Sequence, residues 1–347
     1  MDADFIVNFP GLGINDLPIN RVAFSVFGVA IYWYGLIITF GVLLCLILAY
    51  REAPKFKVDQ EFLLDNFIVI IFSSLIGARL YYVAFSWDEF KDDLVSILDT
   101  RQGGMAFYGG VIAAVISIYI LHKVKKKKMI EFLDFVAVYL PLGQAVGRWG
   151  NFVNQEAFGE NTSLPWGMIS NGTTNYLNAH PELAQNPNLP VHPTFLYEAI
   201  GNIILFAIMH RYRKNNKHAG SVVALYMIGY GLIRFFLEGI RTDSLYIGHT
   251  NIRVSQALSL LIFLLGLIYF FITIRKLKLS EAETEDKIFE KAKSDLDVDD
   301  KTEKGQSESD NNEDEDNVED EKIKSNPEND ELEIKTDVED DVELSDN

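Results

Sequence analysis

Arginines at the ends of long apolar segments are the residues of this sequence with the clearest capacity for chemistry. Arg148 closes one apolar segment and opens the run GRWGNFVNQEAFG, while Arg234 and Arg241 lie at the end of another. An arginine deep in a membrane span costs about 2.5–3.5 kcal/mol on insertion scales, so each needs a compensating partner. Because the planar guanidinium matches carboxylates and phosphates, these arginines indicate either internal ion pairs or a bound anion.

Internal pairing is the simpler alternative for two of these arginines. Arg234, Glu238 and Arg241 are spaced by four and three residues, which puts them on one helix face. Arginines on separate helices at one depth repel each other unless an anion joins them. At head-group depth the abundant anion is a phospholipid phosphate, so we expect the arginines of different helices to converge on one.

The segment after Arg148 carries a second polar group. Asn151, Asn154 and Glu156 follow it, and Gly159 ends the run. Asparagine supplies both donors and acceptors, and glycine permits turns and close backbone approach where irregular backbone lines a polar cavity in a membrane. An asparagine-capped helix end is the simpler alternative, but it explains only one of these polar residues. The favoured interpretation is therefore a binding or catalytic role.

Two tyrosines and a histidine complete the candidate set. Tyr34 lies early in the first apolar segment, and Tyr108 lies between two glycine pairs in GGMAFYGG. The glycines could serve close helix packing alone, but a buried tyrosine hydroxyl needs a partner. His192 is more simply the entry of a helix. No two histidines have metal-ligand spacing, and Cys45 is the only cysteine, so we expect neither a metal site nor an internal disulfide.

Seven apolar segments must position these residues. Runs long enough to cross about 30 Å of hydrocarbon occupy residues 24–49, 63–85, 104–122, 130–147, 195–210, 221–240 and 254–274. Polar residues interrupt the fourth and fifth, and these must face protein because lipid offers no hydrogen-bond partner. The sequence therefore predicts an all-α, polytopic membrane protein with seven transmembrane helices.

The distribution of lysine and arginine predicts the orientation. Alternate connecting segments hold 15 of these residues against 6 in the others, and the positive-inside rule places the richer set in the cytoplasm. The N-terminus is then outside and the C-terminus cytoplasmic. In this orientation six spans place polar residues near the outer leaflet. These residues are Tyr34, Arg79, Tyr81, Tyr82, Tyr108, Arg148, His192, Tyr197, Glu198, Arg234, Glu238 and Arg241.

The acidic balance of the chain comes from its C-terminal segment. The formal net charge is −18, yet residues 280–347 hold 29 acidic residues and eight lysines, which leaves +3 on the remainder. Such a segment cannot bury enough surface to offset chain entropy, so we expect disorder, with an acidic docking segment as the alternative. The predicted domains are a transmembrane domain over 1–279 and a disordered acidic cytoplasmic tail over 280–347. No nucleic-acid partner is expected.

These motifs together resemble the phosphatidylglycerol:prolipoprotein diacylglyceryl transferases of bacterial cytoplasmic membranes. The resemblance rests on GRWGNFVNQEAFG, YWYG (32–35), GGMAFYGG (103–110), HPTFLYE (192–198) and GYGLIRFFLEGIRTD (229–243). It implies a seven-helix, multi-pass enzyme of the bacterial cell membrane that needs no cofactor. Its substrates would be phosphatidylglycerol and the lipobox cysteine of a prolipoprotein, and its products a thioether-linked diacylglyceryl prolipoprotein and glycerol 1-phosphate.

The resemblance also implies roles for single residues. The implied catalytic residues are Arg234, Tyr108, Asn151, Asn154, Glu156 and Tyr34, and the implied phosphatidylglycerol-binding residues are Arg148, Arg241 and Gly159. Tyr108 departs from the family pattern, which has a histidine proposed as a base before the second glycine pair. A phenol is mostly protonated at neutral pH, so we expect Tyr108 to orient the head group, and the identity of the base stays open.

Two other classes of membrane protein compete with a transferase. An outward-facing anion or lipid transporter would also hold arginines in a polar cavity, but its site should lie near the midplane and open to both sides. A seven-helix photoreceptor needs a Schiff-base lysine, and the last apolar segment has none. The transferase is the favoured prediction and the transporter is its alternative.

Overall fold

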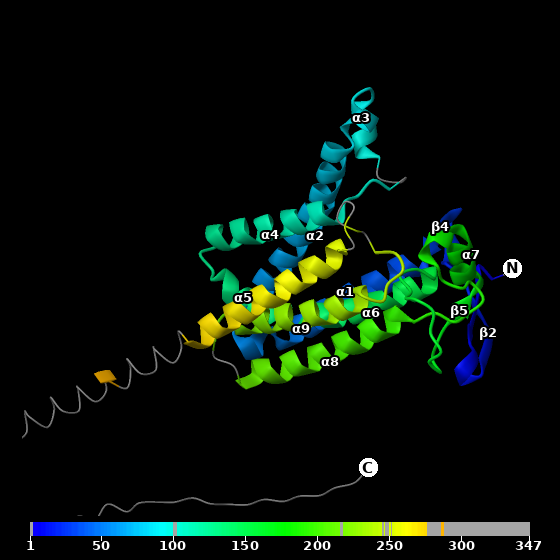
Figure 1. Ribbon diagram of the computed structural model, residues 1–347. Helices are drawn as coiled ribbons and strands as arrows, with labels where there is room; N and C mark the ends of the chain where they lie inside the picture. The colour runs from blue at the N-terminus through cyan, green and yellow to red at the C-terminus, as the bar shows by residue number, and fades with distance from the viewer. Residues whose placement is uncertain are drawn as a thin grey trace, which may run out of the picture. The chain divides into compact units, whose positions relative to one another are not determined.

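The computed structural model describes residues 3–99, 103–215, 218–244, 246, 250, 252–275 and 286–287. Within these residues the protein is mostly helical, as the sequence predicts (Figure 1). The predicted acidic tail, 280–347, lies outside the described residues except for positions 286 and 287, so its disorder stays a prediction.

Short strands precede the first long helix, where an all-α fold was predicted. β1 (Phe5–Phe9) pairs antiparallel with β2 (Ile14–Ile19) and with β5 (Ile169–Ser170), and β3 (Val22–Val26) pairs with β4 (Val29–Tyr32). Phe27 and Gly28 form the turn of the second hairpin, both with positive φ. The predicted first span, 24–49, therefore begins too early, because its first residues are β-branched and aromatic residues that favour a hairpin.

Five long helices have the length and composition to cross a membrane. They are α1 (Trp33–Glu52) with the 3-10 turn η2 (Ala53–Phe56), α2 (Gln60–Phe85), α4 (Phe107–Val124), α9 (Ser221–Glu238) and the helix Val254–Arg275. The bent pair α5 (Met129–Ala137) and α6 (Tyr139–Asn154) is a sixth candidate span, with a bend of 42°. Pro141 explains this bend, because it has no N–H to donate to Ala137 and its ring crowds that carbonyl.

The fifth predicted span, 195–210, corresponds to α8 (Thr194–Asn215), which is long but less apolar than the others. Its buried face carries Glu198 and Asn202, which are 3% and 0% exposed. The described residues thus contain five candidate spans, or six with the bent pair. The remaining short elements are η1 (Pro10–Leu12), α3 (Trp87–Phe90), η3 (Leu94–Leu98), α7 (Asn171–Ala179) and η4 (Pro181–Leu183).

The helices pack in two groups. In the first, α2 lies along α4, and Gly109 fits so closely against Gly77 and Tyr81 that a Cβ at Gly109 would overlap both. In the second, α6 packs between α1 and α8, and α8 packs against α9 (Figure 1). Because α8 runs antiparallel to α6 and α9, its first turn meets their last turns.

A small core fixes that end of the second group. Val7 of β1, Met168 and Val191 are almost completely buried against one another, and Phe195 of α8 belongs to the same cluster. The N-terminal sheet is thereby attached to the segment that leads from α6 to α8. This core holds the end of α6 and the start of α8 in register, which is where the predicted site residues gather.

Candidate active site

Glu198 is the centre of the polar cluster at this end of the helices. Its carboxylate is 3% exposed on the first turns of α8. Oε1 lies 2.8 Å from Nη2 of Arg148 on α6, and Oε2 accepts a 3.0 Å hydrogen bond from Nη1 of Arg234 on α9. Two arginines from different helices thus converge as predicted, but a buried carboxylate of the protein joins them.

Glu238 completes the charge balance of this cluster. It lies one turn beyond Arg234 on α9 and accepts a 2.6 Å hydrogen bond from Nη2 of that arginine. The internal pairing that the four-residue spacing suggested is therefore present. The negative charges of the two carboxylates balance the positive charges of the two guanidinium groups. Their mutual attraction offsets the free-energy cost of removing the four groups from water. Arg148 is the most accessible member, with a 22% exposed side chain.

Three polar side chains at the end of α6 and in the turn after it form a hydrogen-bond network that reaches Arg148. Asn151 accepts a 3.0 Å hydrogen bond from Nη1 of Arg148 and donates one of 2.9 Å to Oε1 of Glu156. Asn154 donates to the same oxygen at 3.4 Å. The turn depends on left-handed backbone at Gln155 and at Ala157, which fold the chain back on the helix end. The Asn-Asn-Glu group predicted from the sequence is thus one network that orients Arg148.

Tyr34 lies beside this network. Its ring packs on Gly150 of α6, where a Cβ would lie 2.8 Å from Cδ2 of Tyr34. The side chain is 40% exposed, and within the described residues its hydroxyl has no hydrogen-bond partner. Tyr34 of helix α1 therefore has a hydroxyl without a partner among the described residues, on a ring that lies against Gly150, two residues after Arg148.

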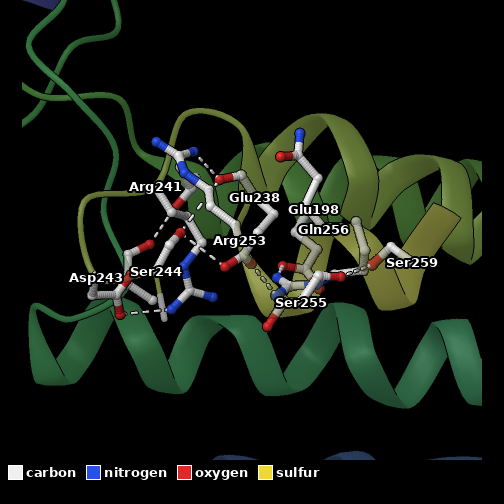
Figure 2. Close-up of polar contacts among 12 residues, drawn as sticks. Glu198, Glu238, Arg241, Asp243, Ser244, Arg253, Ser255, Gln256 and Ser259 are labelled. Carbon is white, nitrogen blue, oxygen red and sulfur yellow. Dashed lines mark hydrogen bonds and ion pairs between the residues drawn. The ribbon is translucent and has the colours of Figure 1, made fainter. Parts of the chain in front are cut away.

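Arg241 and Gly159 meet through their backbones. Gly159 forms an antiparallel bridge with Arg241, and the next amide, that of Glu160, donates to the carbonyl of Ile240 at 2.9 Å. A Cβ on Gly159 would lie 2.8 Å from Cβ of His192, so only glycine fits where these segments cross. The guanidinium of Arg241 holds Asp243 in a bidentate pair, at 2.8 Å and 2.6 Å (Figure 2).

Ser244 and Arg253 hold Glu238 in position through hydrogen bonds, and neither residue was predicted from the sequence to belong to the site. Ser244 donates a 2.8 Å hydrogen bond to Oε1 of Glu238, and Arg253 donates to its backbone carbonyl (Figure 2). Arg253 directly precedes the last apolar helix, so a cation at the end of an apolar segment was the signal that the sequence offered. Glu198 was also recognised in the sequence only as one polar residue among twelve, and the structure makes it the centre.

Arg79 does not join this cluster, contrary to prediction. Its guanidinium lies 5.0 Å from the ring of Phe90 and donates hydrogen bonds of 2.7–3.2 Å to backbone carbonyls. The accepting carbonyls are those of Ser96, Ile97, Asp99, Gly103 and Gly104. Carbonyl dipoles can satisfy a buried guanidinium without any anion, so Arg79 serves to hold the connection between α2 and α4.

We expect a side chain at Gly104 to disrupt the hydrogen bonds of Arg79, and a side chain at Gly103 to disturb them much less. Both have positive φ, but a Cβ at Gly104 would overlap Nη1 of Arg79, whereas a Cβ at Gly103 meets nothing within 4 Å. Each alanine costs roughly 1–2 kcal/mol for left-handed backbone. Gly104→Ala should cost about 2 kcal/mol more, because Arg79 loses charged hydrogen bonds. Thermal unfolding of the two variants tests this, and equal destabilisation would contradict it.

Tyr108 is exposed, where the sequence reasoning expected a buried hydroxyl. It is the second residue of α4, its side chain is 54% exposed, and its ring packs edge-on against Phe107. No hydrogen bond to its hydroxyl occurs within the described residues. The flanking glycines explain this position, since they let α4 lie close against α2.

His192 lies in the segment before α8. Its Nδ1 is 3.0 Å from the hydroxyl of Tyr197, which accepts a 2.8 Å hydrogen bond from Nε1 of Trp166. Burial lowers the pKa of His192 below its usual value, and the carboxylate of Glu160 opposes this only in part. The imidazole is therefore neutral at neutral pH.

Comparison with known proteins decides the family of the chain. A sequence model of the family described as prolipoprotein diacylglyceryl transferase matches residues 21–272. The chain belongs to the prolipoprotein diacylglyceryl transferase family. The match contains every predicted site residue and most of the predicted transmembrane domain, and it ends before the acidic segment. This membership and the long apolar helices make the protein a multi-pass membrane enzyme of the transferase class.

Curated relatives support the family assignment. Each is named phosphatidylglycerol--prolipoprotein diacylglyceryl transferase. The relative from Finegoldia magna is 43% identical over 250 residues, which are 72% of this chain and 94% of the relative. Those from Clostridioides difficile and Clostridium botulinum are 39% and 40% identical, over 70% and 75% of this chain and 90% and 99% of their own lengths. The favoured prediction of a transferase is confirmed over the transporter alternative.

Proposed function

We propose that this diacylglyceryl transferase moves the diacylglyceryl group of phosphatidylglycerol to the lipobox cysteine thiol of a prolipoprotein. The main structural support for this proposal is the cluster of Arg148, Glu198 and Arg234. In this cluster two guanidinium groups from separate helices lie within 3.0 Å of one buried carboxylate. The names of the relatives specify the same lipid and the same class of protein acceptor. No cofactor is needed, because phosphate already activates the diacylglyceryl carbon.

The reaction is a displacement at the glyceryl carbon that bears the phosphate. The sulfur forms a bond to that carbon, the carbon–oxygen bond to phosphate breaks, and the thiol proton leaves to a base. Glycerol 1-phosphate departs with the oxygen and gains negative charge. A thiol has a pKa of about 8.5 and needs only modest activation. Stabilisation of the leaving phosphate by Arg148 and Arg234 is therefore the larger contribution.

The surrounding residues have distinct proposed roles. Arg148 binds the phosphate first, because it is more exposed than Arg234, and Asn151, Asn154 and Glu156 hold it in place. Arg234 stabilises charge in the transition state. The free hydroxyls of Tyr34 and Tyr108 donate to the glycerol or to the phosphate. Arg241 and Gly159 shape the loop over the head group. When the lipid binds, the guanidinium of Arg241 leaves Asp243 and contacts the head group.

The transfer itself is tested with purified full-length protein. Radiolabelled phosphatidylglycerol and a lipobox peptide are supplied in detergent, and label on the peptide is measured. The same peptide with serine in place of cysteine should accept none, because its hydroxyl is a far weaker nucleophile than a thiol. A folded wild-type protein that fails to label the cysteine peptide would overturn the proposal.

Tyr108 is expected to orient the head group without carrying a proton. Tyr108→Phe should lower the transfer rate by about tenfold, the value of one hydrogen bond, and not by the 10²–10⁴ of a lost acid or base. Tyr119→Phe is the matched control, since Tyr119 is also on α4 and is 56% exposed. A loss beyond a hundredfold would make Tyr108 a proton carrier.

We also propose seven spans in the bacterial cell membrane, with the N-terminus outside and the C-terminus cytoplasmic. The count of seven needs α8 to cross as well as the bent pair. The packing of α8 between α6 and α9 supports its assignment as a membrane span, because this packing shields the polar residues on its buried face from lipid. The test uses a Cys45→Ala background with a single cysteine placed either near Asp4 or after Lys278. Labelling of each cysteine by a membrane-impermeant thiol reagent in intact cells reports on which side of the membrane that end of the chain lies.

Removal of the acidic segment is expected to leave the activity nearly unchanged. The family match ends at residue 272, and every proposed site residue precedes that point. A chain truncated after Lys278 should therefore transfer the lipid within about twofold of the full-length rate. Membrane preparations of the two proteins, matched for amount, provide the comparison. Dependence of the rate on the tail would show that residues 280–347 are more than a solvated tail.

A further inference from the structure

A cavity lies far from the candidate active site, at the opposite end of α8. Its volume is about 400 Å³, and Arg213 is among its lining residues. Arg213 and Glu198 are fifteen residues apart on α8, which corresponds to about 22 Å at 1.5 Å per residue. The cavity is therefore separate from the cluster of Arg148, Glu198 and Arg234. Its wall comes from the start of α2, from α5, and from the connection between α8 and α9.

Aromatic rings form the apolar part of this wall. They belong to Phe56, Phe62, Phe132 and Phe135. Phe62, Phe132 and Phe135 are part of one buried hydrophobic cluster with the end of α1, so their positions are held by packing. A cavity of this size with a rigid apolar wall can accommodate a ligand larger than a water molecule or a simple ion.

The carboxylates that line the cavity are already engaged. Asp59 accepts backbone hydrogen bonds at the start of α2, and Asp134 accepts them from Gly220 and Val223 at the start of α9. Glu131 forms a 2.8 Å ion pair with Lys128 at the rim. None of these carboxylates pairs with Lys57 or Lys127, although Asp59 and Asp134 keep their charges, because hydrogen bonds from backbone amides do not neutralise a carboxylate.

Two lysines at the cavity, by contrast, have no ion-pair partner among the described residues. Lys57 and Lys127 are exposed lining residues, and neither has a carboxylate within ion-pair distance among the described residues. Arg213 is 5% exposed and uses its Nη atoms for Glu52, for the carbonyl of Phe135 and for the hydroxyl of Tyr139. Its Nε–H is buried and finds no acceptor in the described part of the chain.

We propose that this cavity binds an anionic phosphate group, supplied by a phospholipid head group or by free phosphate. Phosphate oxygens would accept hydrogen bonds from the ammonium groups of Lys57 and Lys127, which are the strong, charge-assisted kind, and Arg213 would add positive charge from the wall. Basic pockets between transmembrane helices bind anionic head groups by the same chemistry. The phenylalanine wall would contact the glycerol or the first methylene groups of a lipid.

The test removes the two rim lysines. Lys57→Asn with Lys127→Gln deletes two charges from exposed positions, and asparagine tolerates the left-handed backbone at Lys57. The matched control, Lys55→Gln with Lys123→Gln, deletes two charges from neighbouring positions that do not line the cavity. Thermal unfolding of each full-length protein in detergent is followed against inorganic phosphate at constant ionic strength. A second titration uses short-chain phosphatidylglycerol in neutral detergent. Both titrations are repeated with Arg148→Ala present in every protein, so that binding at the proposed active site does not account for the response.

The expected result is ligand-dependent stabilisation of the wild type and of the control, with the apparent Kd weakened at least about tenfold in the Lys57/Lys127 variant. Stabilisation by inorganic phosphate identifies a site for phosphate itself, and stabilisation by the lipid alone identifies a head-group site. The proposal is overturned if neither ligand stabilises the wild type. It is also overturned if the cavity variant and its control respond alike.

Discussion

Arg148→Ala is expected to reduce diacylglyceryl transfer by about 10²–10³-fold, the loss found when a donor to developing negative charge is removed. Arg148 is more accessible than Arg234, and its guanidinium contacts Asn151 as well as Glu198. The variant would lack the first contact with the lipid phosphate and would leave Glu198 with Arg234 alone. Initial rates with labelled phosphatidylglycerol and a lipobox peptide measure the effect.

Two companion variants separate charge from geometry in this prediction. Arg148→Lys retains the charge but not the planar fork, so it should recover only part of the rate. Arg21→Ala removes an exposed arginine whose partner, Asp4, lies 3.9 Å away, and it should transfer the lipid at the wild-type rate. Retention of more than a tenth of the wild-type rate by Arg148→Ala would be incompatible with its proposed role.

Glu198→Gln is expected to be the most destabilising single substitution at the site. Glu198 is 3% exposed and touches both Arg148 and Arg234. Removing its charge leaves Arg148 without a carboxylate partner and Arg234 with Glu238 alone, and uncompensated buried charge typically costs about 3–5 kcal/mol. The midpoint of thermal unfolding should fall accordingly, and the transfer rate should fall because the two arginines are no longer held together.

The control for Glu198→Gln is Glu182→Gln, an exposed glutamate of η4 that should change neither stability nor rate. Double substitution sharpens the test. Adding Arg148→Ala to Glu198→Gln removes one of the unpaired cations, so the double variant should be more stable than Glu198→Gln alone. Independent, additive effects would show that the Arg148–Glu198 contact contributes nothing to folding.

Local patterns of the sequence predicted a large part of this protein. Long apolar runs correspond to the helices, because a membrane span requires an uninterrupted apolar length that is visible without any tertiary contact. The Asn151–Glu156 group was also predictable, since its members lie within one helix end and the following turn. The pairing of Arg234 with Glu238 follows from a four-residue helical spacing. Each of these features depends on neighbours in the chain.

Tertiary structure changed the reading of residues whose partners are distant in the chain. Arg79 and Arg148 occupy similar positions near the C-terminal ends of apolar segments. One guanidinium is satisfied by loop carbonyls and the other by Glu198, 50 residues further along the chain. Tyr108 was expected to be buried between its glycines, yet those glycines bury the backbone against α2 and leave the ring exposed. Apolar and β-branched residues before Trp33 also suit a strand as well as a helix.

A polytopic membrane protein with arginines at its helix ends and an Asn-Asn-Glu turn beside Arg148 could be predicted from the order of the residues alone. That Arg148 and Arg234 share Glu198, and that Arg79 belongs to a separate contact, became visible only in the folded protein. A buried charge must be compensated, but composition does not say by which group. Helix packing makes that choice, because it determines which side chains reach the same few ångströms of space.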